Sequence, residues 1–155
     1  MDSYPSASAL IASAWTRLEG PPVDRSLWLD AIGDALDTGL PPQEEAERAV
    51  ARLAALALAL PEEPPVVRES ALHAICTAST RYRFPFALVE PLAAGADRFE
   101  PVLLVYVLGI LADTHDAAAL PVVERYLSHP EAEVRREAAD AVRELEWAWD
   151  RDRAV

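Results

Sequence analysis

The chain has 155 residues, of which 52% are hydrophobic and 26% charged, and its formal net charge is −12. This hydrophobic fraction excludes an intrinsically disordered chain, and the single cysteine excludes an intramolecular disulfide. No apolar run approaches the roughly 20 residues that cross a bilayer, and the strongly negative charge argues against contact with nucleic-acid phosphates. We therefore expect a single cytoplasmic domain, residues 1–155, with no membrane or nucleic-acid partner.

Prolines divide the sequence into helix-sized segments, in which apolar residues recur with the i, i+3, i+4 spacing of an amphipathic helix. The segment that begins at Pro101 is rich in Val and Leu, so a buried strand is the alternative there. We predict an all-α protein with four antiparallel helix pairs. The predicted helices are Ser8–Leu18, Asp24–Asp37, Gln43–Leu60, Pro65–Ser79, Pro85–Ala94, Glu100–Leu111, Ala117–Leu127 and Glu131–Trp149.

An internal repeat underlies these pairs. The pattern Val-Arg-x-x-Ala-x-x-Ala followed by Ile or Val occurs at Val67–Ile75 and again at Val134–Val142. A degenerate copy begins between them at Pro101, at offsets of 34 and 33 residues, and a weaker copy begins near Leu27. A helical hairpin that recurs every 33–34 residues has the period of a helical solenoid. Its alanines let paired helices approach closely.

The stretch Ala119–Val142 resembles a HEAT repeat of the bacterial HEAT-like, phycobilisome lyase-type class, and Val67–Ile75 resembles the second helix of another. The resemblance implies a right-handed α-α superhelix of about four hairpins, at residues 4–37, 42–79, 85–112 and 116–149, the first of them degenerate or a cap. It also implies that Arg68 and Arg135 tie one repeat to the next. Val102 stands at that position in the middle repeat.

HEAT arrays commonly bind partners on the concave face lined by their second helices, and three sets of residues map to that face. The second predicted repeat contributes Glu69 and His73. The third contributes large aliphatic residues, namely Leu103, Leu104, Val107, Ile110 and Leu111. The fourth contributes Arg136, Glu137, Asp140 and Glu144. The aliphatic set is either an exposed apolar patch that binds a partner or a second copy, or a face that the rest of the array buries.

We predict a non-catalytic scaffold that binds a basic protein partner, in one version as an immunity or antitoxin protein that masks a basic toxin domain. The alternative is a bilin lyase-like subunit of the same family, with a tetrapyrrole near His73 and Cys76. Neither a nucleophile constellation nor a cofactor motif is present, and Asp113–Asp116 is interpreted as a helix N-cap rather than a metal site. Of Trp147 and Trp149, one is expected to cap the last repeat.

Overall fold

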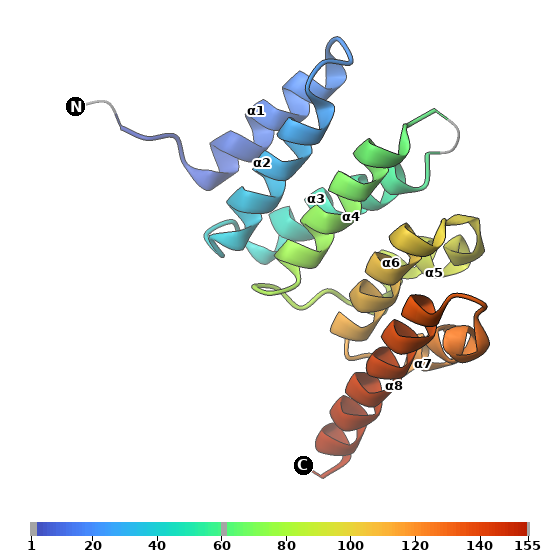
Figure 1. Cartoon of the computed structure of the whole chain (residues 1–155). Helices are drawn as coiled ribbons and strands as arrows, with labels where there is room; N and C mark the ends of the chain where they lie inside the picture. The colour runs from blue at the N-terminus through green and yellow to red at the C-terminus, as the bar shows by residue number, and fades with distance from the viewer. Residues whose placement is uncertain (1–2, 60–61, 155) are drawn as a thin grey trace. The chain divides into compact units, whose positions relative to one another are not determined.

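The computed structural model of the chain describes residues 3–59 and 62–154. Throughout these residues the secondary structure is helical and contains no strand, which confirms the all-α prediction and removes the strand alternative at Pro101 (Figure 1). The α-helices are α1 (Ala7–Glu19), α2 (Arg25–Asp37), α3 (Gln43–Ala57), α4 (Pro65–Ala78), α5 (Phe86–Ala94), α6 (Pro101–Asp113), α7 (Leu120–Glu124) and α8 (Ala132–Arg153). Three short 3-10 helices accompany them: η1 (Ala96–Arg98), η2 (Ala117–Ala119) and η3 (Arg125–Ser128).

Local signals explain most of the helix boundaries. The Ser6 hydroxyl accepts a hydrogen bond from the Ala9 amide at 3.1 Å and caps α1. Gly39, with φ of 69°, forms the left-handed turn that follows α2. Pro121 lies in the first turn of α7, where its missing N–H is tolerated. The predicted seventh helix is divided among η2, α7 and η3. The predicted end of the third helix, at Leu60, lies outside the described residues.

The first of two compact units ends at Tyr82 and contains α1–α4. Helix α1 packs against α2, and α3 against α4, so the unit consists of two helical hairpins (Figure 1). Their second helices, α2 and α4, also pack against each other. At this contact an added Cβ on Gly33 would lie 3.2 Å from the Cα of Ala74, so glycine allows the two backbones to approach.

The second unit begins at Arg83 and contains α5–α8. Here α6 packs against α8, another contact between second helices, while α5 contacts α6, and α7 and η3 contact α8. The Tyr126 hydroxyl in η3 donates a hydrogen bond to Asp97 in η1, with 2.5 Å between the oxygens. Burial, together with the bond to the Asp97 carboxylate, raises the pKa of Tyr126 to about 12. This bond joins two irregular segments of the unit.

The division into two units is finer than the single domain expected from the sequence. The boundary lies between Tyr82 and Arg83, which is between the second and third predicted repeats. Each unit therefore holds two of the predicted hairpins, and the break coincides with the repeat period rather than interrupting a hairpin.

Three hairpins share an arginine that binds backbone carbonyls between their two helices. Arg25 donates to a carbonyl in the last turn of α1 at 2.8 Å, and Arg68, which is 1% exposed, donates to the carbonyl of Ala57 at the end of α3 at 2.9 Å. Arg135 donates to two carbonyls of the segment before α8, each at 2.7 Å. These bonds run within a hairpin, and Arg25 also forms an ion pair at 2.5 Å with Glu63 of the next hairpin. In the remaining hairpin the position is taken by Val102, which is 61% exposed.

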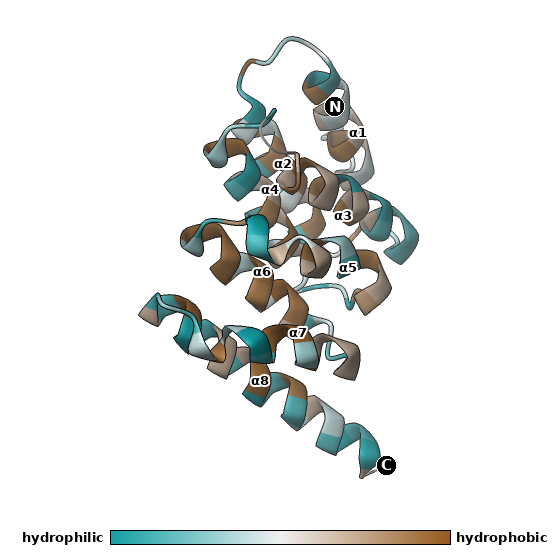
Figure 2. Cartoon of the chain, turned by 90° about the vertical axis from the view of Figure 1, so that its right-hand side faces the viewer, coloured by the Kyte–Doolittle hydropathy of each residue, from teal (hydrophilic) through white to brown (hydrophobic). Residues whose placement is uncertain are grey.

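Helix α6 is hydrophobic over most of its length, whereas hydrophilic and hydrophobic residues alternate along α8 (Figure 2). The 13 residues of α6 would span only about 20 Å at 1.5 Å per residue. Across the described ranges, no helix combines the length and the apolar character needed to cross a membrane.

Candidate functional site

The structure corrects one part of the predicted partner-binding face. The five aliphatic residues of α6, proposed as exposed anchors, are each no more than 3% exposed. They therefore form no exposed apolar patch, and the alternative that this face is buried is correct for all five. The residues concerned are Leu103, Leu104, Val107, Ile110 and Leu111. A helix that is apolar on all sides is stable in water only when its neighbours cover it.

The other two predicted sets lie in different units. Glu69, half-buried, and His73, exposed, lie on α4 in the first unit. Arg136, exposed, lies on α8 in the second unit together with the three predicted acids of that helix. The two sets therefore belong to separate surfaces, one in each unit.

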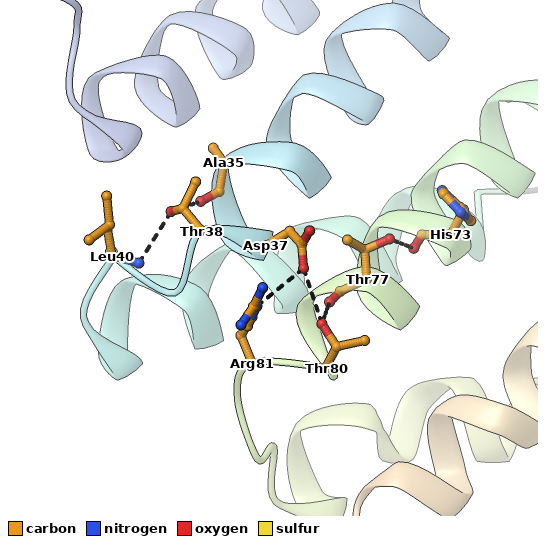
Figure 3. Close-up of polar contacts among 8 residues, drawn as sticks. All are labelled: Ala35, Asp37, Thr38, Leu40, His73, Thr77, Thr80 and Arg81. Atoms are coloured by element: carbon orange, nitrogen blue, oxygen red, sulfur yellow. Dashed lines mark hydrogen bonds and ion pairs between the residues drawn. The ribbon is translucent and has the colours of Figure 1, made fainter.

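Around His73 the polar contacts hold the ends of α2 and α4 together (Figure 3). The Thr77 hydroxyl donates to the backbone carbonyl of His73 at 3.0 Å. One carboxylate oxygen of Asp37 accepts hydrogen bonds from the Thr80 hydroxyl at 3.2 Å and from Nε of Arg81 at 3.4 Å. These side chains stabilise helix ends, and this accounts for them without a ligand.

In the second unit, carboxylates gather along one side of α8. Glu137, Asp140 and Glu144 are spaced i, i+3 and i+7, which places them on one helical face. Glu137 and Glu144 are half-buried, and Asp140 is exposed. An added Cβ on Gly109 would lie 3.5 Å from a carboxylate oxygen of Glu137, so this side chain lies against α6. We call these three residues and Asp113, at the end of α6, the acidic strip.

Burial and mutual repulsion raise the pKa values of two carboxyl groups in the acidic strip. The pKa of Asp113 is raised to about 6, chiefly by burial and in smaller part by the charges of Glu144 and Glu137, while the guanidinium of Arg83 opposes the shift. Burial also raises the pKa of Glu137, and the neighbouring carboxylates on α8 add to the effect. Carboxylates with raised pKa values are held at an electrostatic cost, which a cation placed among them would reduce.

Histidine and tryptophan side chains border the acidic strip. His115, in the left-handed region with φ of 52°, has Nε2 2.9 Å from a carboxylate oxygen of Glu144. Its ring meets Trp147 edge to face, with centroids 6.4 Å apart, and the Arg151 guanidinium lies 4.7 Å from the Trp147 ring centroid. Trp147 is 58% exposed and Trp149 49%, so the expectation that one of them caps the last repeat is wrong.

The chemistry of this surface is that of charge and hydrogen bonding. In residues 3–59 and 62–154, no group of three or more His, Cys, Asp or Glu side chains is arranged to hold a metal ion. Sequence reasoning found Glu137, Asp140 and Glu144 but did not connect them with Asp113, because the two segments come together only through the packing of α6 against α8. The sequence near Asp113 offered one hint of this link, namely that the residue lies just beyond the end of a predicted helix. Comparison with known proteins finds no matching family model, no matching curated protein and no matching solved structure.

Proposed function

We propose that the chain is a non-catalytic binding module that recognises a basic segment of a partner protein through the acidic strip. The observation that carries this proposal is that Asp113, Glu137 and Glu144 lie half-buried where α6 packs against α8, and this placement raises the pKa of the first two. Like charges held together in a half-buried site favour a ligand that supplies positive charge. A cytoplasmic scaffold, or an immunity-type protein that neutralises a basic toxin domain, is the concrete form of this role.

The aromatic border of the strip fits a guanidinium ligand in particular. Trp147 is exposed on the same helix, one turn beyond Glu144, and already stacks with Arg151 of its own chain. An arginine of a partner could stack on an indole in the same way while a carboxylate of the strip accepts its N–H groups. Arginine is therefore the preferred cation over lysine at this site.

The architecture proposed for this module is a right-handed solenoid of about four HEAT-like hairpins. Two features support it. Second helices pack against each other in both units, α2 against α4 and α6 against α8. Arginine-to-carbonyl bonds also recur in three of the four hairpins. Repetition of one hairpin design along a chain is what a solenoid requires.

The test compares two triple variants that have the same net charge. The first, Glu137→Gln with Asp140→Asn and Glu144→Gln, neutralises the three acids that α8 contributes to the strip. The control neutralises three exposed acids elsewhere in the same unit, with the changes Glu90→Gln, Glu124→Gln and Glu146→Gln. Glu146 is a useful control because it lies on the opposite side of α8 from Glu137.

Binding is measured by fluorescence anisotropy with fluorescein-labelled octa-arginine at low and high salt. We expect the strip variant to bind about tenfold more weakly at low salt, from about 0.5 kcal/mol for each lost charge, and the control to bind like the wild type. The difference should shrink at high salt. Equal weakening in both variants would show that only net charge matters and would refute a localised site.

A further inference from the structure

A second surface lies in the first unit, along the seam where α1 packs against α2. A groove of about 390 Å³ opens there. Its lining is mostly apolar and comes from both helices of the first hairpin. The lining includes Leu10 and Ala14 of α1, and Trp28, Ala31, Asp34 and Ala35 of α2. None of them belongs to the acidic strip or to the residues predicted from the sequence to bind a partner.

The groove has a floor of small residues and larger residues beside it. Ala14 and Ala35 are buried and Ala31 is half-buried, so alanine side chains form the deeper part of the lining. Leu10 is 44% exposed, and Trp28 is half-buried. Small residues between larger ones let another helix approach closely, as Gly33 does where α4 packs against α2 on another side of the same helix.

The charge beside the groove is negative. Asp34 lines it, and Asp30 lies one turn earlier on the same helix; both are exposed and have no hydrogen-bond or ion-pair partner among the described residues. They are about 6 Å apart along the helix axis, at 1.5 Å per residue. The Arg17 guanidinium lies 5.2 Å from the ring centroid of Trp28, which is nearly two turns of α2 before Asp34. The Asp34 end of the groove therefore favours a positive charge.

We propose that this groove is a docking site for an amphipathic helix of a partner protein, with apolar residues at i, i+4 and i+7 and two basic residues four positions apart. The α2 side of the groove from Trp28 to Ala35 is about 10 Å long, which matches three such anchors. Basic residues four apart repeat the spacing of Asp30 and Asp34. A second copy of this chain is the less suitable occupant, because two chains of net charge −12 repel each other.

The experiment uses the full chain and a defined probe. The probe is an alanine-based helical peptide with leucines at i, i+4 and i+7 and two lysines four residues apart along one flank. A scrambled peptide of the same composition, with its leucines spread around the helix, is the control ligand. Titration into ¹⁵N-labelled protein should shift backbone amides of α1 and α2 and the Trp28 indole, and the scrambled peptide should not.

Matched variants separate the groove from general acidity. Asp30→Lys with Asp34→Lys should weaken binding about tenfold, whereas Glu44→Lys with Glu62→Lys, two exposed acids of the same unit, should not. Ala31→Gln should block the groove, whereas Ala51→Gln, at an exposed position of α3, should leave binding intact. Thermal melts confirm that each variant is folded.

Three outcomes would overturn the proposal: amide shifts confined to α8, equal binding of the scrambled peptide, or concentration-dependent dimerisation of the free protein that Ala31→Gln abolishes. The last outcome would assign the groove to a second copy. The strip variant with Glu137→Gln, Asp140→Asn and Glu144→Gln should bind the probe like the wild type. Failure of this inference and failure of the acidic-strip proposal are therefore distinguishable.

Discussion

Replacement of Asp113 by asparagine should stabilise the protein at neutral and alkaline pH. Burial, with a smaller contribution from the charge of Glu144, raises the pKa of Asp113 from its ordinary value of 3.8 to about 6. Above that pH the carboxylate is ionised in the folded and the unfolded chain alike. Only the folded chain has to hold the charge in a half-buried site beside another carboxylate. Asparagine has nearly the same shape and no charge, so it removes this cost.

The magnitude follows from the pKa difference. One pKa unit corresponds to about 1.4 kcal/mol, so the whole difference would be about 3 kcal/mol in a fully shielded site. Because Asp113 is partly exposed, solvent screening reduces the expected gain to about 1–2 kcal/mol. The folded-state pKa is raised, so the favourable contribution of this carboxyl is complete below pH 3.8 and is lost as the pH rises through about 6.

Urea unfolding followed by circular dichroism, at about pH 8 and about pH 4.5, measures the effect on the free energy of unfolding. Asp113→Asn should be more stable than the wild type at the higher pH, and the gain should shrink at the lower pH. Asp150→Asn, at an exposed position of α8, is the control and should change little at either pH. A gain that is absent at the higher pH, or equal at both values, would refute the assignment of the cost to ionised Asp113.

Three further variants test the packing. Leu104→Asp with Val107→Asp places two carboxylates at positions no more than 2% exposed and should abolish the cooperative thermal transition; an unchanged melt would show that α6 is not core. Arg68→Met leaves the carbonyl of Ala57 without this donor and should cost about 2 kcal/mol in urea unfolding, and a loss below experimental error would contradict a stabilising role. Tyr126→Phe should cost about 1 kcal/mol and remove a phenol that ionises near pH 12 in an ultraviolet titration.

The helices and their pairing could be predicted from the sequence because the signals for them are local. The i, i+4 spacing of apolar residues and the prolines place helix boundaries, as at Pro65 and Pro101, which begin α4 and α6. The repeated pattern at Val67 and Val134 also located two second helices at equivalent positions in their hairpins, each with a buried valine. Such features depend on residues a few positions apart, so they can be read without knowledge of the tertiary contacts.

The candidate surfaces depended on contacts between distant segments. Whether Leu104 is an anchor or core is decided by what packs over α6, and the sequence of that helix is compatible with both. Asp113 became part of the acidic strip because the end of α6 lies beside α8, and its raised pKa exists only in that arrangement. The groove beside Ala31 likewise needs α1 to lie against α2. Sequence thus determined the helices and their hairpins, through short-range periodicity, whereas burial and charge clustering arose from tertiary packing, because both are properties of neighbours that are remote in the chain.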